Sequence, residues 1–183
     1  MTILTNVLND VIKSGTMSVV VQWLNIKSLT NETWQNALLY TLLGRVVYQG
    51  IIKPLSNTER FGTYQFFLDD VLREVTTVFV VEILRGGQFS NAWWTSLATS
   101  ISGLFVYHFY VYPYLNPMDK KWSPYSSVHA TTNDVLKHAV LTVVGSFLST
   151  GTLNATTINS YLKKIAGFAT YNIFVNPLME RTF

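Results

Sequence analysis

The side chains of this chain that could carry out chemistry are few and follow no catalytic or metal-binding motif. The histidines, His108, His129 and His138, have no metal-ligand spacing to one another or to carboxylates, so neither a zinc nor an iron site is expected. Asp69 and Asp70 are adjacent, and adjacent residues of a helix point about 100° apart, which suits a paired acid and base poorly. We therefore predict no enzymatic activity and no cofactor.

The other residue patterns of the chain point the same way. The chain has no cysteine, which excludes disulfides, thiolate metal sites and thiol catalysis. Gly86 and Gly87 form a hinge, because no phosphate-loop lysine frame follows them. A net charge of +3 without a long basic run gives no reason to expect nucleic-acid binding. The candidate polar groups in the interior of a helical bundle are Arg45, Glu82 and His108.

Two residue frames recur three times along the chain. One is a glycine, a tyrosine four residues later and a proline six residues after that: Gly44, Tyr48 and Pro54; Gly103, Tyr107 and Pro113; Gly167, Tyr171 and Pro177. The other precedes it and pairs an acidic with a basic residue: Asp10 and Lys13; Asp70 and Arg73; Asp134 and Lys137. We therefore predict a single domain, residues 1–183, built from repeated units at about 7–54, 66–113 and 131–177.

Each unit is predicted to be a helical hairpin. The expected helices are 7–26, 31–53, 66–85, 90–112, 133–150 and 154–176. The second helix of each unit starts at a good cap (Asn31, Ser90 or Asn154) and ends before the proline. The acidic residue is expected to cap the first helix and to pair with the basic residue three positions on. The glycine allows a neighbouring helix to approach closely, and the tyrosine either hydrogen-bonds across that contact or lies in an aromatic belt.

Hydropathy favours a membrane protein. The stretch 86–118 has no charged residue, and its middle is long enough to cross a hydrocarbon core of roughly 30 Å. Trp93 and Trp94 at one end and several tyrosines at the other are typical of the two membrane interfaces. Charged residues make up 13% of the chain, against roughly 25% in globular domains. We expect an all-α integral membrane bundle of about six helices, four to six of them spanning, with the termini on the cytoplasmic side.

Size, lack of cysteine, aromatic richness and short loops make the chain similar to one class of viral proteins. These are the small multi-span structural proteins of the inner membrane beneath the capsid of large icosahedral double-stranded DNA viruses. The likeness is one of general character over the whole chain, and it carries over no residue. It implies a virion component that contacts capsid-type structural proteins.

The function expected from the sequence is a non-enzymatic membrane scaffold, in a virion inner membrane or a host or organelle membrane. Its partners would be the lipid bilayer, other membrane or capsid-type structural proteins and copies of itself, without nucleic acid. One alternative is a small channel or transporter with a pseudo-threefold six-helix bundle. Arg45 argues against it, because the equivalent residues of the other units are Leu104 and Phe168, and an ion pathway would repeat its polar lining. A second alternative is a soluble helical-repeat interaction protein.

Overall fold

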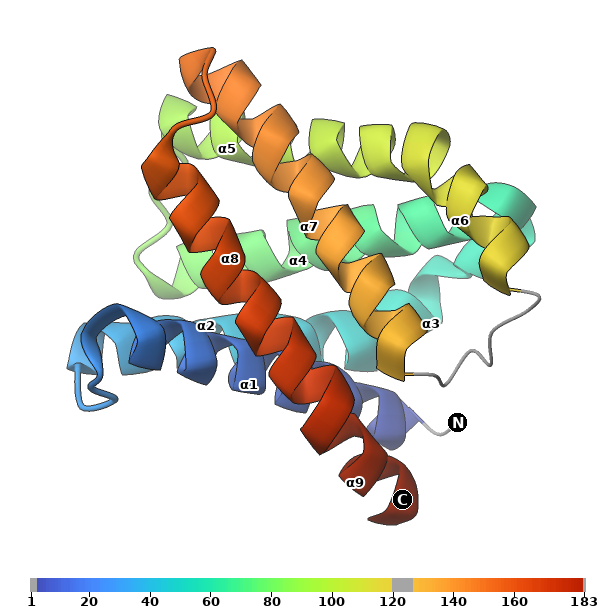
Figure 1. The fold of residues 1–183 in the computed structure, drawn as a ribbon, viewed down its shortest axis with the longest axis horizontal. Helices are drawn as coiled ribbons and strands as arrows, with labels where there is room; N and C mark the ends of the chain where they lie inside the picture. The colour runs from blue at the N-terminus through green and yellow to red at the C-terminus, as the bar shows by residue number, and fades with distance from the viewer. Residues whose placement is uncertain (1–2, 120–126, 183) are drawn as a thin grey trace.

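The computed structural model describes residues 3–119 and 127–182, in which six long helices form three consecutive hairpins (Figure 1). The first helices of the units are α1 (Ile3–Ile26), α4 (Gln65–Leu84) and α7 (Ser127–Thr150). The second helices are α2 (Glu32–Val47), α5 (Asn91–Val106) and α8 (Ala155–Thr170). The hairpin turns lie at one end of the bundle and both chain termini at the other (Figure 1).

Each second helix begins at its predicted cap. The side chains of Asn31, Ser90 and Asn154 each accept a hydrogen bond from the backbone N–H three residues further on, at 2.9, 3.2 and 2.8 Å. These bonds satisfy N–H groups that have no partner inside the helix. The polar hinge before each cap therefore ends one helix and sets the start of the next.

The second helices do not stop before the prolines, so that prediction is wrong. Each passes through a π-helical turn that starts at the repeated tyrosine: η1 (Tyr48–Ile52), η3 (Tyr107–Val111) and η4 (Tyr171–Val175). Short helices follow: α3 (Lys53–Ser56), α6 (Tyr112–Asp119) and α9 (Asn176–Thr182). A 3₁₀ segment, η2 (Thr58–Tyr64), leads from the first unit into α4.

The π turn explains how the helix tolerates proline. The residue before each proline donates its N–H to the tyrosine carbonyl five residues back, as Lys53 does to Tyr48. Proline has no N–H, and its ring clashes with the carbonyl four residues back in a regular α-helix. One wider turn changes that geometry, so the helix bends rather than ends.

The three hairpins close into a ring, because α2 packs on α4, α5 on α7, and α8 back on α1. At each of these contacts the repeated glycine lies against a backbone. A Cβ atom on Gly44, Gly103 or Gly167 would lie 2.8, 3.1 or 3.0 Å from a Cα atom of the facing helix. The facing residues are Thr77, Leu141 and Met17, each seven positions after the repeated aspartate. The contacts are therefore equivalent under a pseudo-threefold rotation.

Substitution Gly44→Ala is expected to lower the free energy of unfolding by about 1–3 kcal/mol, because its Cβ must displace the backbone of α4. Gly15→Ala is the matched control, since nothing lies within 4 Å of a Cβ at that position of α1. The control is expected to be neutral or to stabilise by about 0.5–1 kcal/mol, as alanine does in helices. Urea unfolding followed by circular dichroism measures both, and equal effects of the two would contradict close packing at Gly44.

The expectation of an integral membrane bundle is wrong for the part of the chain that the structure describes. Among residues 3–119 and 127–182, no helix has both the length and the apolar character to cross a bilayer. Helix α5 has 16 residues before the π turn begins, whereas a spanning helix needs about 20. The longer first helices carry the repeated acidic and basic residues in their interior, such as Asp70 and Arg73 in α4.

The interpretations that required spanning helices are corrected with it. These are the bilayer scaffold, its placement in a virion, host or organelle membrane with cytoplasmic termini, and the channel or transporter. Trp93 and Trp94, which were expected at a membrane interface, belong to an aromatic cluster. They pack edge-to-face with each other at 4.7 Å between ring centroids, and Trp93 packs on Phe79 of α4 at 4.9 Å. Together with Phe89, this cluster closes the hairpin turn between α4 and α5.

Candidate functional site

The repeated acidic and basic residues meet near the pseudo-threefold axis. We call them the charge ring: Asp10, Lys13, Asp70, Arg73, Asp134 and Lys137. They lie inside α1, α4 and α7, which begin at Ile3, Gln65 and Ser127, so the aspartates do not cap these helices as predicted. Asp134 is buried, and the side chain of Asp70 is 11% exposed. The charges therefore face one another rather than solvent.

The pairing inside the charge ring differs from the predicted pairs within each helix. Lys13 Nζ lies 2.6 Å from Asp134 Oδ2, and Lys137 contacts Asp70, so both lysines bind the aspartate of the preceding unit in the ring. Of the three pairs predicted within a helix, the structure shows that between Arg73 and Asp70. Most ion pairs of the charge ring thus join different units, and these pairs hold the six helices together.

The polar residue after each repeated tyrosine orients the aspartate of its own unit. Gln49 donates to Asp10 at 3.1 Å, and Asn172 donates to Asp134 at 2.9 Å. His108 Nε2 lies 2.7 Å from Asp70 Oδ2. The π turn starts at the tyrosine, and the side chain of the residue after the tyrosine points to the charge ring.

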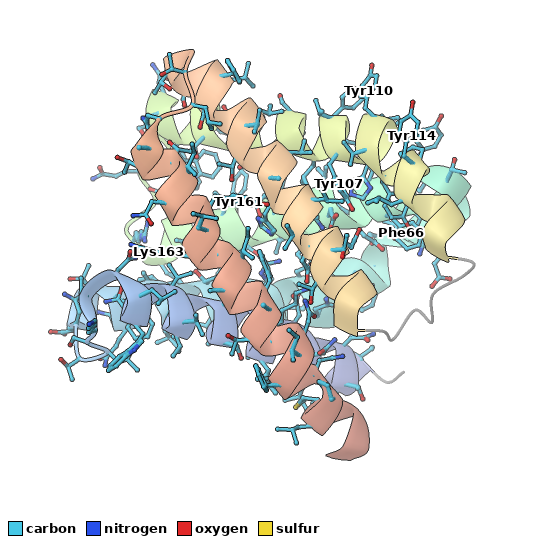
Figure 2. The ribbon with its side chains drawn as sticks, in the orientation of Figure 1. Phe66, Tyr107, Tyr110, Tyr114, Tyr161 and Lys163 are labelled. Carbon is cyan, nitrogen blue, oxygen red and sulfur yellow. The ribbon has the colours of Figure 1, made fainter. Side chains whose placement is uncertain are left out.

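The repeated tyrosines are buried and join neighbouring units. Tyr107 donates its hydroxyl hydrogen to Asn133, and Tyr171 donates to Asn9. Tyr48 faces the equivalent Asp69, and burial together with that carboxylate raises the pKa of Tyr48. Each tyrosine therefore binds or faces the residue before the aspartate of the next unit, and Figure 2 shows Tyr107 directed into the bundle behind α7.

Electrostatics at Asp70 show how strongly the charge ring is coupled. Burial alone would raise the pKa of Asp70, but the charges of Arg73 and Lys137 and the hydrogen bond from His108 hold it well below its ordinary value. Burial lowers the pKa of Lys137, and the nearby Arg73 adds to that effect. Asp70 is thus ionised at neutral pH, where it balances part of a cationic cluster.

A cavity of about 290 Å³ lies beside the charge ring, and we call it the central cavity. Its lining comes from α2, α4, α5, α7 and α8, so residues of all three units surround it, and Ser96 of the lining is exposed to solvent. The charged lining residues are Arg45, Asp70, Arg73, Glu74, Lys137 and Lys164. Hydroxyl groups of Ser96, Thr99 and Ser100 complete one wall. This arrangement can bind a polar ligand.

No known protein family, curated protein or solved structure matches this chain.

The three predicted interior groups occupy different environments. Arg45 lines the central cavity, and its Nε atom is buried without a hydrogen-bond partner among the described residues. His108 is bound to Asp70 beneath that cavity. Glu82 lies near the end of α4, is part-exposed, and does not line the cavity. Of the other histidines, His138 lines the cavity, whereas the side chain of His129 lies outside the described part.

Sequence reasoning missed Lys164, His138 and the hydroxyl residues of α5 as cavity residues. A signal for Lys164 was present in the repeat, because the equivalent positions, three before the glycine, hold Thr41 and Ser100. A charge at one position out of three is a departure from the repeat. In the described chain, no three carboxylate or imidazole side chains are grouped as metal ligands.

A second feature lies on the outside, at the end that carries the termini. Three and seven residues after each repeated tyrosine an apolar side chain is exposed: Ile51 and Leu55; Tyr110 and Tyr114; Phe174 and Leu178. Their exposed fractions range from 54% to 80%. We call these six residues the apolar rim, and Figure 2 shows Tyr110 and Tyr114 directed away from the bundle.

Proposed function

We propose that the chain is a non-enzymatic helical-repeat interaction protein that assembles with copies of itself through the apolar rim. The observation that carries this proposal is the strong exposure of the rim residues, 54% to 80%, at equivalent positions of all three units. A second repeated set near the hairpin turns is less exposed, 43% to 61%: Trp23 and Leu24; Ile83 and Leu84; Phe147 and Leu148. Copies of the chain are among the partners expected from the sequence.

The exposed apolar residues are not required by the fold. The glycine, tyrosine and charge-ring contacts described above already join the three units inside the bundle. Apolar side chains that are exposed together at one end of a protein can mark a site of association. The rim therefore supports a binding role better than a structural one.

The pseudo-threefold arrangement favours a second copy as the occupant. Each unit contributes one apolar pair, so the end of the bundle carries three similar patches around one axis. A surface that repeats about an axis can meet the same surface of another copy in a closed, symmetric contact. Aromatic residues such as Tyr110, Tyr114 and Phe174 are enriched at the centres of such interfaces.

The full-length chain is expected to elute as an oligomer of its 20.7 kDa protomer in size-exclusion chromatography with light scattering. The double variant Leu55→Glu, Tyr114→Glu is expected to shift the mass towards that of the monomer, because two charges would have to be buried in the interface. Circular dichroism checks that the helices are retained.

The matched control places the same charges at the opposite end of the bundle. Gln88→Glu with Thr152→Glu changes two exposed residues of the hairpin turns and is expected to leave the oligomer intact. A wild-type monomer at concentrations of up to hundreds of micromolar would overturn the proposal. If both double variants shifted the measured mass equally towards that of the monomer, the assignment of the interface to the apolar rim would be overturned.

A further inference from the structure

The repeat provides an internal reference for deciding which residues of the central cavity are needed for folding. Arg45 follows its glycine directly, and the residues at that position in the other units, Leu104 and Phe168, are each 3% exposed. Two of the three units therefore hold a buried apolar side chain at the position after the glycine. A guanidinium at the third site costs desolvation, and burial is the main cause of the lowered pKa of Arg45.

Lys164 departs from the repeat in the same way. Its equivalents are the small hydroxyl residues Thr41 and Ser100, and it lines the same cavity as Arg45 although it comes from α8 rather than α2. Its neighbour Lys163 instead donates to Asn25 of α1 at 2.7 Å (Figure 2 labels Lys163 on α8). Two basic residues from different units thus converge on one cavity.

The charges of the central cavity do not balance. Four arginine and lysine side chains line it, against the two carboxylates of Asp70 and Glu74. Asp10, outside the lining, offsets part of the charge of Arg45 and Arg73. Asp70 is already shared by Arg73 and Lys137. The Nε atom of Arg45 is buried and has no hydrogen-bond partner within the described residues. A buried donor of this kind is expected to have an acceptor, such as a water molecule or an anion.

We propose that the central cavity binds a small anion with two or more negative charges, carried by phosphate or carboxylate groups. Arg45 and Lys164 contact the charged oxygens, and the hydroxyl groups of α5 donate further hydrogen bonds. Guanidinium and ammonium donors bind such oxygens through short, charge-assisted hydrogen bonds. The volume of about 290 Å³ is at the lower end of ligand pockets, which suits a compact anion rather than a nucleotide.

Isothermal titration calorimetry with inorganic pyrophosphate and with citrate tests the proposal on the full-length chain. Saturable one-to-one binding of at least one of them is expected. Binding of pyrophosphate alone would assign the ligand to phosphate compounds, and binding of citrate alone to polycarboxylates. Absence of saturable binding for both would overturn the proposal.

The variants are taken from the repeat so that folding is preserved. Arg45→Leu introduces the residue of the second unit, and Lys164→Thr that of the first. Each is expected to weaken binding by about tenfold or more, through loss of a charged hydrogen bond. Lys163→Thr removes the same charge one residue away and is expected to bind like the wild type.

Thermal unfolding provides a second measurement. Millimolar ligand is expected to raise the melting temperature of the wild type and of Lys163→Thr, but not that of Arg45→Leu or Lys164→Thr. A similar loss in Lys163→Thr, or unchanged affinity in both cavity variants, would show that the anion binds elsewhere and would overturn the site.

Discussion

Replacing Asp70 by asparagine is expected to lower the free energy of unfolding by about 3–5 kcal/mol. The carboxylate of Asp70 is shared by Arg73, Lys137 and His108, and a neutral amide cannot balance the charges of Arg73 and Lys137. The side chain of Lys137 is only 13% exposed, so its charge would lose its partner with little water to replace it. Urea unfolding at neutral pH measures the difference.

Asp69→Asn is the control for this prediction. It removes a carboxylate from the adjacent residue, but the equivalent positions of the other units already hold asparagine, Asn9 and Asn133. We expect a change below about 1 kcal/mol, typical of a substitution outside a buried ionic network. A comparable loss in Asp69→Asn would mean that general charge, rather than the charge ring, sets the stability.

Acidification is expected to destabilise the fold well above the range in which carboxylates titrate. Burial, together with the charges of Lys137 and Lys164, lowers the pKa of His138 from 6.5 to about 3. The imidazole of His138 thus stays neutral in the folded protein, whereas in the unfolded chain it takes up a proton as the pH falls below about 6.5. Unfolding is favoured by that uptake, so its free energy falls by up to about 1.4 kcal/mol per pH unit until the folded-state pKa is reached.

The variant His138→Leu separates this effect from that of the carboxylates. The ring of His138 packs on Phe168 at 4.5 Å between centroids, and leucine can fill part of that space without titrating. The variant is expected to keep a constant stability from pH 6.5 down to about 4.5. Below about 4 it should lose stability as well, because the pKa values of Asp70 and Asp134 are lowered in the folded state. An unchanged slope near pH 6 in the variant would assign the effect to another group.

Local features were predictable because their causes lie within a few residues. Asn31, Ser90 and Asn154 cap helices through bonds to N–H groups three positions away, and any helix starting there would form them. The helix ends at the prolines were not predictable in this way. The π turn at Tyr48 and its equivalents is tolerated in a fold where each repeated tyrosine is buried against the next unit.

The membrane prediction failed for a related reason. An apolar stretch without charges shows that its side chains must be buried. It does not show whether lipid or the rest of the protein buries them. Part of the stretch from 86 to 118 is buried inside the protein, as with Leu97, Leu104 and Tyr107. The described chain has no helix that could span a bilayer.

The sequence by itself determined the threefold repeat, the six helices, the caps of the second helix of each unit, and the departure of Arg45 from its equivalents. Only the tertiary structure decided that Lys13 pairs with Asp134, that Lys137 pairs with Asp70, and that Lys164 joins Arg45 at one cavity. The physical reason is the separation of these residues along the chain. Ion pairs and cavities depend on which helices become neighbours, and the closure of α8 onto α1 brings together side chains from opposite ends of the chain.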